Sequence, residues 1–177
     1  MSEVRDEAVG YEGAVLGGTA EPLTFDDHTS LAVISVMMAQ QCRQSLIIVS
    51  RHLDPAIYDN EAFADALKNM ALKNRTAQIR LFIIESRPLI STGHRVLELS
   101  SRLPSYIEIR APAPQHKQFN EAILVADNTG YVHRQFSARF EGTADFNDRR
   151  IAAGLVDRIE EMWERGVPDT NFRRLHI

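Results

Sequence analysis

The stretch EAILVADNTGYVHR, residues 121–134, carries the clearest indication of the fold. Two runs, Glu121–Asp127 and Tyr131–Arg134, flank Asn128-Thr129-Gly130, whose residue types are typical of a tight turn between antiparallel strands. Gly130 can supply the positive φ that such turns require. The stretch therefore predicts a β-hairpin with an apolar first strand.

Upstream of this hairpin, apolar runs alternate with helical patterns. Ser45–Ser50 and Gln78–Ile84 are short continuous apolar runs, which is typical of strands buried on both faces. Tyr106–Arg110 alternates and predicts a third strand. Predicted helices begin at Asp27, Thr29 or Ser30, at Asp59 or Asn60, at Ser91 or Thr92, and at Asp148.

The order of these elements predicts a single α/β layer fold with a largely parallel sheet. Residues 1–24 are rich in acids and glycines and are interpreted as a flexible acidic leader, with a short edge strand near Leu23–Phe25. The α/β domain is predicted over residues 25–166, and residues 167–177 form a C-terminal tail.

Composition excludes several classes of protein. The chain of 177 residues has 20 Lys and Arg against 24 Asp and Glu, a net charge of −4, which disfavours a general nucleic-acid coat. Cys42 is the single cysteine, so an intramolecular disulfide and a multi-cysteine zinc site are excluded. The longest apolar stretch, Leu31–Ala39, is too short to span a bilayer. We expect a cytoplasmic protein that needs no membrane, metal or cofactor.

At the hairpin the sequence resembles one half of the phospholipase D superfamily, which carries the motif His-x-Lys-x4-Asp on a late strand. Aligning the acid with Asp127 puts the motif's His on Asn120 and its Lys on Ala122. The family's downstream Gly-Ser-x-Asn falls on residues 134–137, which do not match it. The resemblance covers residues 28–165 and implies a single domain with a mixed sheet flanked by helices.

Two other segments, SRHLDPAIYDNEAF at 50–63 and HRVLELSSRL at 94–103, resemble those of an uncharacterised proteobacterial group of domains. This second resemblance supplies no activity.

The departures from the superfamily motif remove its chemistry. In the superfamily the histidine attacks phosphorus, while lysine and asparagine hold the phosphate oxygens. The amide nitrogen of Asn120 has no available lone pair, and Ala122 offers no cation to the transition state. Strand alternation puts 120, 122, 124 and 126 on one face, which is mostly apolar. The resemblance thus implies a non-catalytic domain that binds a partner or an anionic, phosphate-containing ligand.

The resemblance also implies a homodimer, because single-copy members of the superfamily usually pair two half-domains across a two-fold axis. The apolar motif face would suit either such a contact between copies or a filled core.

The candidate ligand-binding residues are cationic or lie at a helix start. His94 and Arg95 fall in the first turn of the third predicted helix, where backbone N–H groups favour anions. With Arg51, they could meet at the carboxyl ends of the strands, the usual ligand edge of such sheets. The favoured alternative is that Arg51 pairs with Asp54 or Asp59 and locks the loop between them.

Arg134, at the end of the hairpin, completes this candidate set. An Arg–Glu pair that braces the final helix would account for the charges around it without a function.

Two further classes of function stay open. One is a phosphodiesterase or nuclease with a repurposed site built on His94, His116 or His133, which requires a histidine and an arginine in one open pocket. The other is a nucleic-acid-binding module that uses Arg173 and Arg174, which the acidic net charge does not favour.

Overall fold

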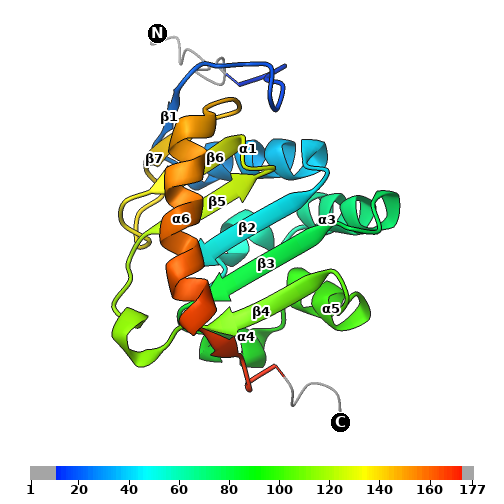
Figure 1. Ribbon diagram of the computed structural model, residues 1–177, viewed down its shortest axis with the longest axis vertical. Coiled ribbons are helices and arrows are strands. Elements are labelled where there is room, and N and C mark those ends of the chain that lie inside the picture. The colour runs from blue at the N-terminus through cyan, green and yellow to red at the C-terminus, as the bar shows by residue number, and fades with distance from the viewer. Residues whose placement is uncertain (1–10, 173–177) are drawn as a thin grey trace, which may run out of the picture.

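An eight-stranded mixed sheet with helices on both faces forms the protein (Figure 1). The computed structural model describes residues 11–172. The strands are β1 (Leu23–Phe25), β2 (Ser45–Ser50), β3 (Gln78–Ile83), β4 (Ile107–Ala111), β5 (Ala122–Ala126), β6 (Gly130–Arg134), β7 (Gly142–Asp145) and β8 (Val167–Pro168). The helices are α1 (His28–Gln41), α2 (Pro55–Tyr58), α3 (Glu61–Lys73), α4 (Arg87–Thr92), α5 (Arg95–Arg102) and α6 (Arg149–Arg165), with a 3₁₀ turn at Pro114–His116.

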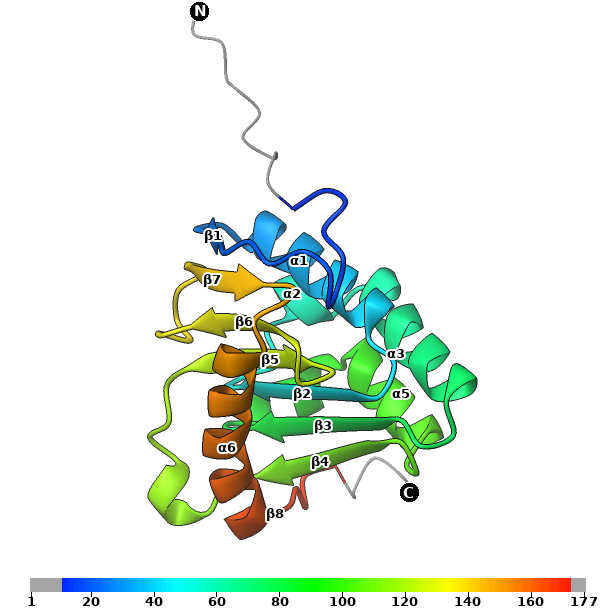
Figure 2. The same cartoon turned by 45° about the horizontal axis from the view of Figure 1, so that its top comes forward.

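The strand order is β1-β7-β6-β5-β2-β3-β4-β8, and Figure 2 shows this succession across the sheet. Only β2–β3 and β3–β4 are parallel pairs, and β5 pairs with β2 in antiparallel fashion. The predicted mixed sheet flanked by helices is therefore confirmed, whereas a largely parallel sheet is wrong. The reason is that β5, β6 and β7 follow one another through short connections. Such connections join antiparallel strands, whereas parallel strands need a longer crossover connection, usually a helix.

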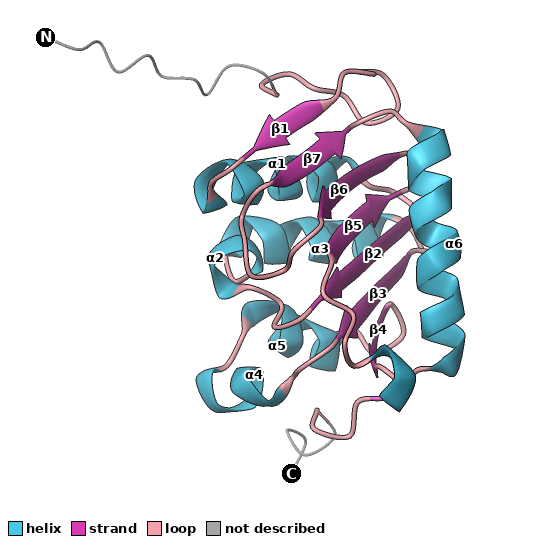
Figure 3. Ribbon diagram, turned by 90° about the vertical axis from the view of Figure 1, so that its left-hand side faces the viewer, coloured by secondary structure: helices cyan, strands magenta, loops and turns pink. Residues whose placement is uncertain are grey.

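The sheet separates two hydrophobic clusters. The larger cluster lies beneath α1–α5 and takes Leu46 and Ile48 from β2, whereas the smaller one lies under α6 and takes Ile47 and Val49. Figure 3 shows α6 alone on its side of the sheet. Because both faces of β2 are covered, its sequence is a continuous apolar run rather than an alternating one.

The helix starts predicted at Asp27, Asn60 and Asp148 are confirmed, since each side chain accepts the hydrogen bond of a backbone N–H in the first turn. The helix start predicted at Ser91 or Thr92 is wrong. Gly93, with φ of 74°, ends α4, and α5 begins after it.

The hairpin is confirmed, but its turn chemistry differs from the prediction. The positive φ values fall on Asp127 and Asn128, both at 52°, and not on Gly130. The N–H of Thr129 donates to the carbonyl of Ala126 at 3.0 Å, which closes the turn around these two residues. Asn and Asp are the non-glycine residues that best tolerate this backbone conformation.

Part of the predicted leader belongs to the folded domain. Ala14 is buried in the main cluster, and β1 pairs with β7 as the edge strand expected near Leu23–Phe25. The side chain of Gln41 donates to the carbonyl of Ala14 at 3.0 Å and accepts the N–H of Leu16 at 2.8 Å. The folded chain therefore begins ahead of residue 25, the predicted boundary.

Strand β7 was not predicted, because its sequence GTAD has no apolar alternation. It begins at Gly142, where an added Cβ would lie 2.3 Å from the carbonyl oxygen of His133 and 3.1 Å from the Cγ of Arg134. The absence of a side chain therefore lets β7 approach β6 closely.

We predict that Gly142→Ala lowers the free energy of unfolding by about 1–3 kcal/mol, since the new methyl group meets backbone that cannot move away cheaply. Urea denaturation measures this change. Gly154→Ala is the matched control, because nothing lies within 4 Å of an added Cβ at this position in α6. The control should raise stability by about 0.5–1 kcal/mol, and a similar loss in both variants would contradict the prediction.

Candidate functional site

Two of the positions aligned with the superfamily motif, Asn120 and Ala122, lie at the end of the sheet where β2 ends and β5 begins. Asn120 is exposed there, and its side-chain oxygen accepts a hydrogen bond from the hydroxyl of Ser137 at 2.8 Å. The N–H of Ser137 donates to the carbonyl of Asn120 at 2.7 Å. We call this end of the sheet, with Asn120, Ser137 and the loop Arg51–Asp59, the motif edge.

A buried cation lies beside Ala122. Ala122 and Arg134 are direct cross-strand partners, so their side chains lie on the same face of the sheet. Arg134 is only 1% exposed and forms an ion pair with Asp54. It also donates to the carbonyl oxygens of Ser137 at 3.2 Å and Arg139 at 3.0 Å. The donors of Arg134 are thus used inside the protein, which leaves little for a ligand.

The motif face is a filled core in this fold. Ala122, Leu124 and Ala126 are each at most 3% exposed, and the last two belong to the cluster beneath α1–α5. Of the two uses considered for this apolar face, packing within the domain is the one observed.

The loop 51–59 is locked by its surroundings, although not through the predicted pairs. Asp54 binds Arg134, and Asp59 accepts the backbone N–H of Arg95 at 2.9 Å and its guanidinium at 3.3 Å. Arg51 instead donates to the carbonyl of Phe119 at 3.0 Å and pairs with the carboxylate of Glu85 at 4.0 Å. The cationic residues that were expected to bind an anion together do lie close to one another, but their contacts hold this loop in place.

His94 is a structural residue of the same loop. Its Nδ1 accepts the N–H of Val96 at 3.1 Å, which caps α5, so its Nε2 carries the proton and donates to the carbonyl of Leu53 at 3.0 Å. The residue is 3% exposed, and burial lowers the pKa of His94. A neutral, buried imidazole with both nitrogens bonded is poorly placed to bind an anion.

The other two histidines considered for catalysis, His116 and His133, lie on different elements of the fold. His133 has Nε2 3.5 Å from the carboxylate of Glu121, which also pairs with Arg158 of α6. His116 lies in the 3₁₀ turn. Arg173 and Arg174 lie outside the described residues.

Three cavities in the described part of the chain have volumes of about 1110, 300 and 220 Å³. Arginines Arg43 and Arg149 line the first, His94 lines the second and Arg80 the third. None of these three cavities combines a histidine with an arginine, as a repurposed phosphodiesterase site requires.

Asp127, the one motif residue retained, joins the hairpin turn to the start of β2. Its carboxylate accepts the backbone N–H groups of Arg43, Gln44 and Ser45 at 2.9, 2.7 and 3.0 Å. The thiol of Cys42 lies 3.3 Å away, and burial, with a smaller contribution from the charge of Asp127, raises the pKa of that thiol well above its ordinary value. A buried, protonated thiol is unreactive.

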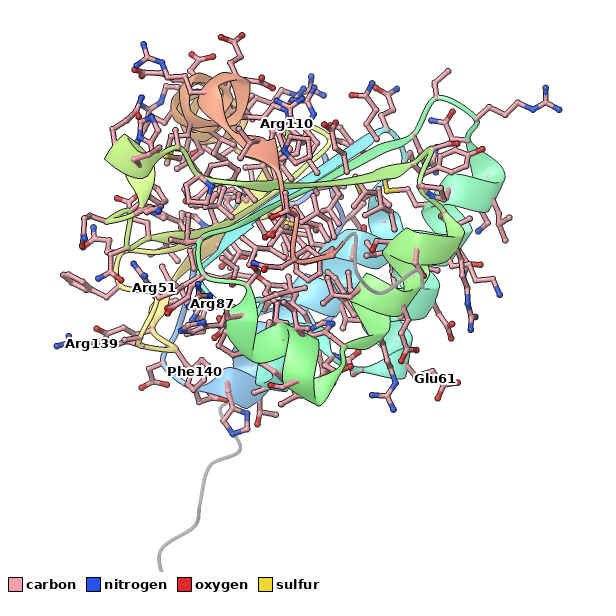
Figure 4. The ribbon with its side chains drawn as sticks, turned by 90° about the horizontal axis from the view of Figure 1, so that it is seen from below. Arg51, Glu61, Arg87, Arg110, Arg139 and Phe140 are labelled. Carbon is pink, nitrogen blue, oxygen red and sulfur yellow. The ribbon has the colours of Figure 1, made fainter. Side chains whose placement is uncertain are left out.

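Sequence reasoning missed an exposed cation at the motif edge. Arg87 follows β3 as the first residue of α4 and forms no ion pair within residues 11–172. Arg51 directly follows the neighbouring strand β2, and Figure 4 shows the two side chains at the same end of the molecule. The position of Arg87 in the segment that follows the buried parallel strand β3 was the signal available in the sequence.

An exposed aromatic ring lies in the loop that follows β6. Phe136 is 51% exposed, and the guanidinium of Arg139 stacks 5.4 Å from its ring centroid. Exposed aromatic and arginine side chains are enriched where proteins bind one another.

Within the described residues, no helix combines the length and apolar character needed to cross a bilayer. No three His, Cys, Asp or Glu side chains gather there in a way that could hold a metal ion.

The fold is that of the phospholipase D family. Nuc from Salmonella typhimurium, a phospholipase D family member, superimposes with a TM-score of 0.58 at 14% identity, over 84% of this chain and 98% of its own. NucT from Helicobacter pylori gives 0.59 at 12% identity, over 84% and 98%. The archaeal chromatin protein TrmBL2, whose structure shows a novel mode of DNA binding, gives 0.60 at 13% identity, over 85% of this chain and 54% of its own.

Likeness at these identities shows the fold alone. No curated protein matches the sequence. The family model for a domain of unknown function, DUF7931, matches residues 27–175, and the chain belongs to this family.

We predict that Asp54→Asn lowers the free energy of unfolding by about 3–5 kcal/mol, because it leaves the buried guanidinium of Arg134 without its counter-charge. Chemical denaturation measures the change. Glu141→Gln removes a partner from the exposed pair with Arg139 and should cost at most about 1 kcal/mol. Equal effects of the two substitutions would argue against a structural role for the buried pair.

We expect stability to fall on acidification partly through His94. The unfolded chain protonates this histidine near its ordinary pKa of about 6.5, whereas the folded protein resists protonation to lower pH. Unfolding therefore takes up a proton below that pH, and stability decreases from about pH 7 towards 5. His94→Asn keeps a capping oxygen but does not titrate, so its denaturation midpoint should depend less on pH than that of the wild type.

His52→Asn is the control for this pH series, since the His52 side chain is 40% exposed. If the denaturation midpoint of His94→Asn depends on pH as strongly as that of the wild type, His94 has the same pKa in the folded and unfolded protein, which would contradict the prediction.

Proposed function

We propose that this protein is a non-catalytic phospholipase D-like domain that binds a phosphate-containing ligand or a protein partner at its motif edge. The observation that carries the proposal is the pairing of Asn120 with Ser137, beside a cation, Arg134, that is neutralised by Asp54. A superfamily nucleophile and phosphate clamp would be expected at these positions. The amide of Asn120 cannot act as the nucleophile, and the buried pair with Asp54 keeps Arg134 from clamping a phosphate. Both features support a domain that binds without turnover.

Ligand binding at this edge is supported by two cations that reach solvent. Arg51 has a side chain that is 27% exposed and lies 4.0 Å from the exposed carboxylate of Glu85, and Arg87 is exposed at the start of α4. Both follow parallel strands at their carboxyl ends, where open α/β sheets usually bind ligands. A guanidinium offers two parallel donors to a phosphate oxygen pair. Arg95 and Arg134 then serve as supports of the loop beneath the ligand.

A second copy of the chain is the protein partner that we propose for this edge. Phe136 and Arg139 project from it, and an aromatic ring stacked with arginine favours a contact between copies. A two-fold axis would place the same residues on both sides.

We predict background rates of hydrolysis for the purified protein on bis(p-nitrophenyl) phosphate and on a single-stranded 12-mer, with no difference in His116→Ala or His94→Asn. The reason is the missing nucleophile at Asn120. Turnover that disappears in one histidine variant would overturn the non-catalytic proposal in favour of a repurposed phosphodiesterase or nuclease.

Binding of the labelled 12-mer, followed by fluorescence anisotropy, should weaken about tenfold in Arg51→Gln/Arg87→Gln, because two charge-assisted contacts are lost. Arg102→Gln removes an exposed cation from α5 and is the control.

Light scattering on the wild type and on Phe136→Ser tests the proposed contact between two copies of the chain. A dimer that dissociates in the variant supports this contact. Unchanged binding and a monomeric mass together would refute both uses of the edge.

A further inference from the structure

A second candidate site lies at the opposite end of the sheet from the motif edge. A groove of about 1110 Å³ opens between the C-terminal ends of α1 and α3, the β5–β6 turn and the first residue of α6. Residues 15–17 form one wall. None of the motif-edge residues lines it, so its properties are independent of the function proposed above.

The walls of this groove are fixed by hydrogen bonds within the protein. Asp127 holds the backbone of Arg43 and Gln44, and the side chain of Asn74 donates to the carbonyl of Arg43 at 2.9 Å. The N–H of Gly17 donates to the carbonyl of Phe146 at 2.9 Å, which anchors the wall from the leader. The groove is thus formed before any ligand binds.

Its charge is positive. Three exposed cations line it, Arg43, Lys73 and Arg149, and none of them forms an ion pair within residues 11–172. Asp127 is the only acid among the lining residues, and its charge is offset by the three backbone N–H groups that it accepts.

The positions of these cations are informative. Lys73 stands in the last turn of α3, where the helix dipole favours a cation. Arg149 stands in the first turn of α6, directly after the capping carboxylate of Asp148, which offsets the helix dipole there. Arg43 and Arg149 line the same polar groove and form no ion pair within residues 11–172, so an anion bound between them would neutralise both guanidinium groups.

We propose that the groove binds a phosphate ester, with the phosphate held by Arg43, Lys73 and Arg149. Side-chain amides of Gln40, Gln44 and Asn69 line the same groove and can hydrogen-bond the rest of the ligand. The phosphate could belong to a free small molecule or to a nucleic-acid strand, since both present the same group to these cations.

Titration calorimetry with pyrophosphate and anisotropy with a labelled single-stranded 12-mer separate these two sources. Arg149→Gln and Arg43→Gln should each weaken binding of the relevant probe about tenfold, and affinity should fall as salt increases. The substituted side chains are exposed, so folding should be unaffected, and thermal denaturation checks this.

Arg102→Gln is the control, and Arg51→Gln/Arg87→Gln reports separately on binding at the motif edge. Affinity that depends on the motif edge and not on Arg43 or Arg149 would overturn the groove while supporting the edge. The reverse pattern would support the groove alone. Absence of binding by either probe, or equal effects of all substitutions, would reject the groove as a phosphate site.

Discussion

The buried pair between Arg134 and Asp54 fixes the arrangement of the motif edge. It ties the end of β6 to the loop after β2, and the same guanidinium holds the carbonyls of Ser137 and Arg139. Ser137 in turn positions Asn120. Desolvating two charges is costly, so such a pair contributes chiefly by excluding other arrangements of the loop.

The proposed loss of catalysis is a property of the packing, not of one residue. Arg134 occupies the space beside Ala122, and Gly142 leaves room for its side chain on the neighbouring strand. A lysine at position 122 would add a second buried cation next to one carboxylate, which the low dielectric there disfavours. Restoring a nucleophile at Asn120 alone would still leave the transition-state charge without a clamp. The amide of Asn120, the small side chain of Ala122 and the buried guanidinium of Arg134 are therefore all compatible with the same packing, which lacks a catalytic site.

Local signals in the sequence were sufficient for much of the fold and for little of the site. β2, α3 and α6 were predictable because apolar runs and capping residues act over a few positions. β7 was not, because its strand character comes from pairing with β6. The partner of Asp54 lies 80 residues away, and nothing near the loop indicates it. The groove joins cations from three distant helices and loops, so no motif could reveal it.

The two proposed sites are physically separate because of β5. This strand runs between them, with Asn120 two residues before its start and Asp127 directly after its end, and the five residues of the strand span roughly 17 Å. All five are buried and apolar. No polar side chain of the strand can relay charge from one end to the other. A ligand in the groove and a ligand or partner at the motif edge can therefore be bound together, and any coupling between them would have to pass through displacement of the sheet itself.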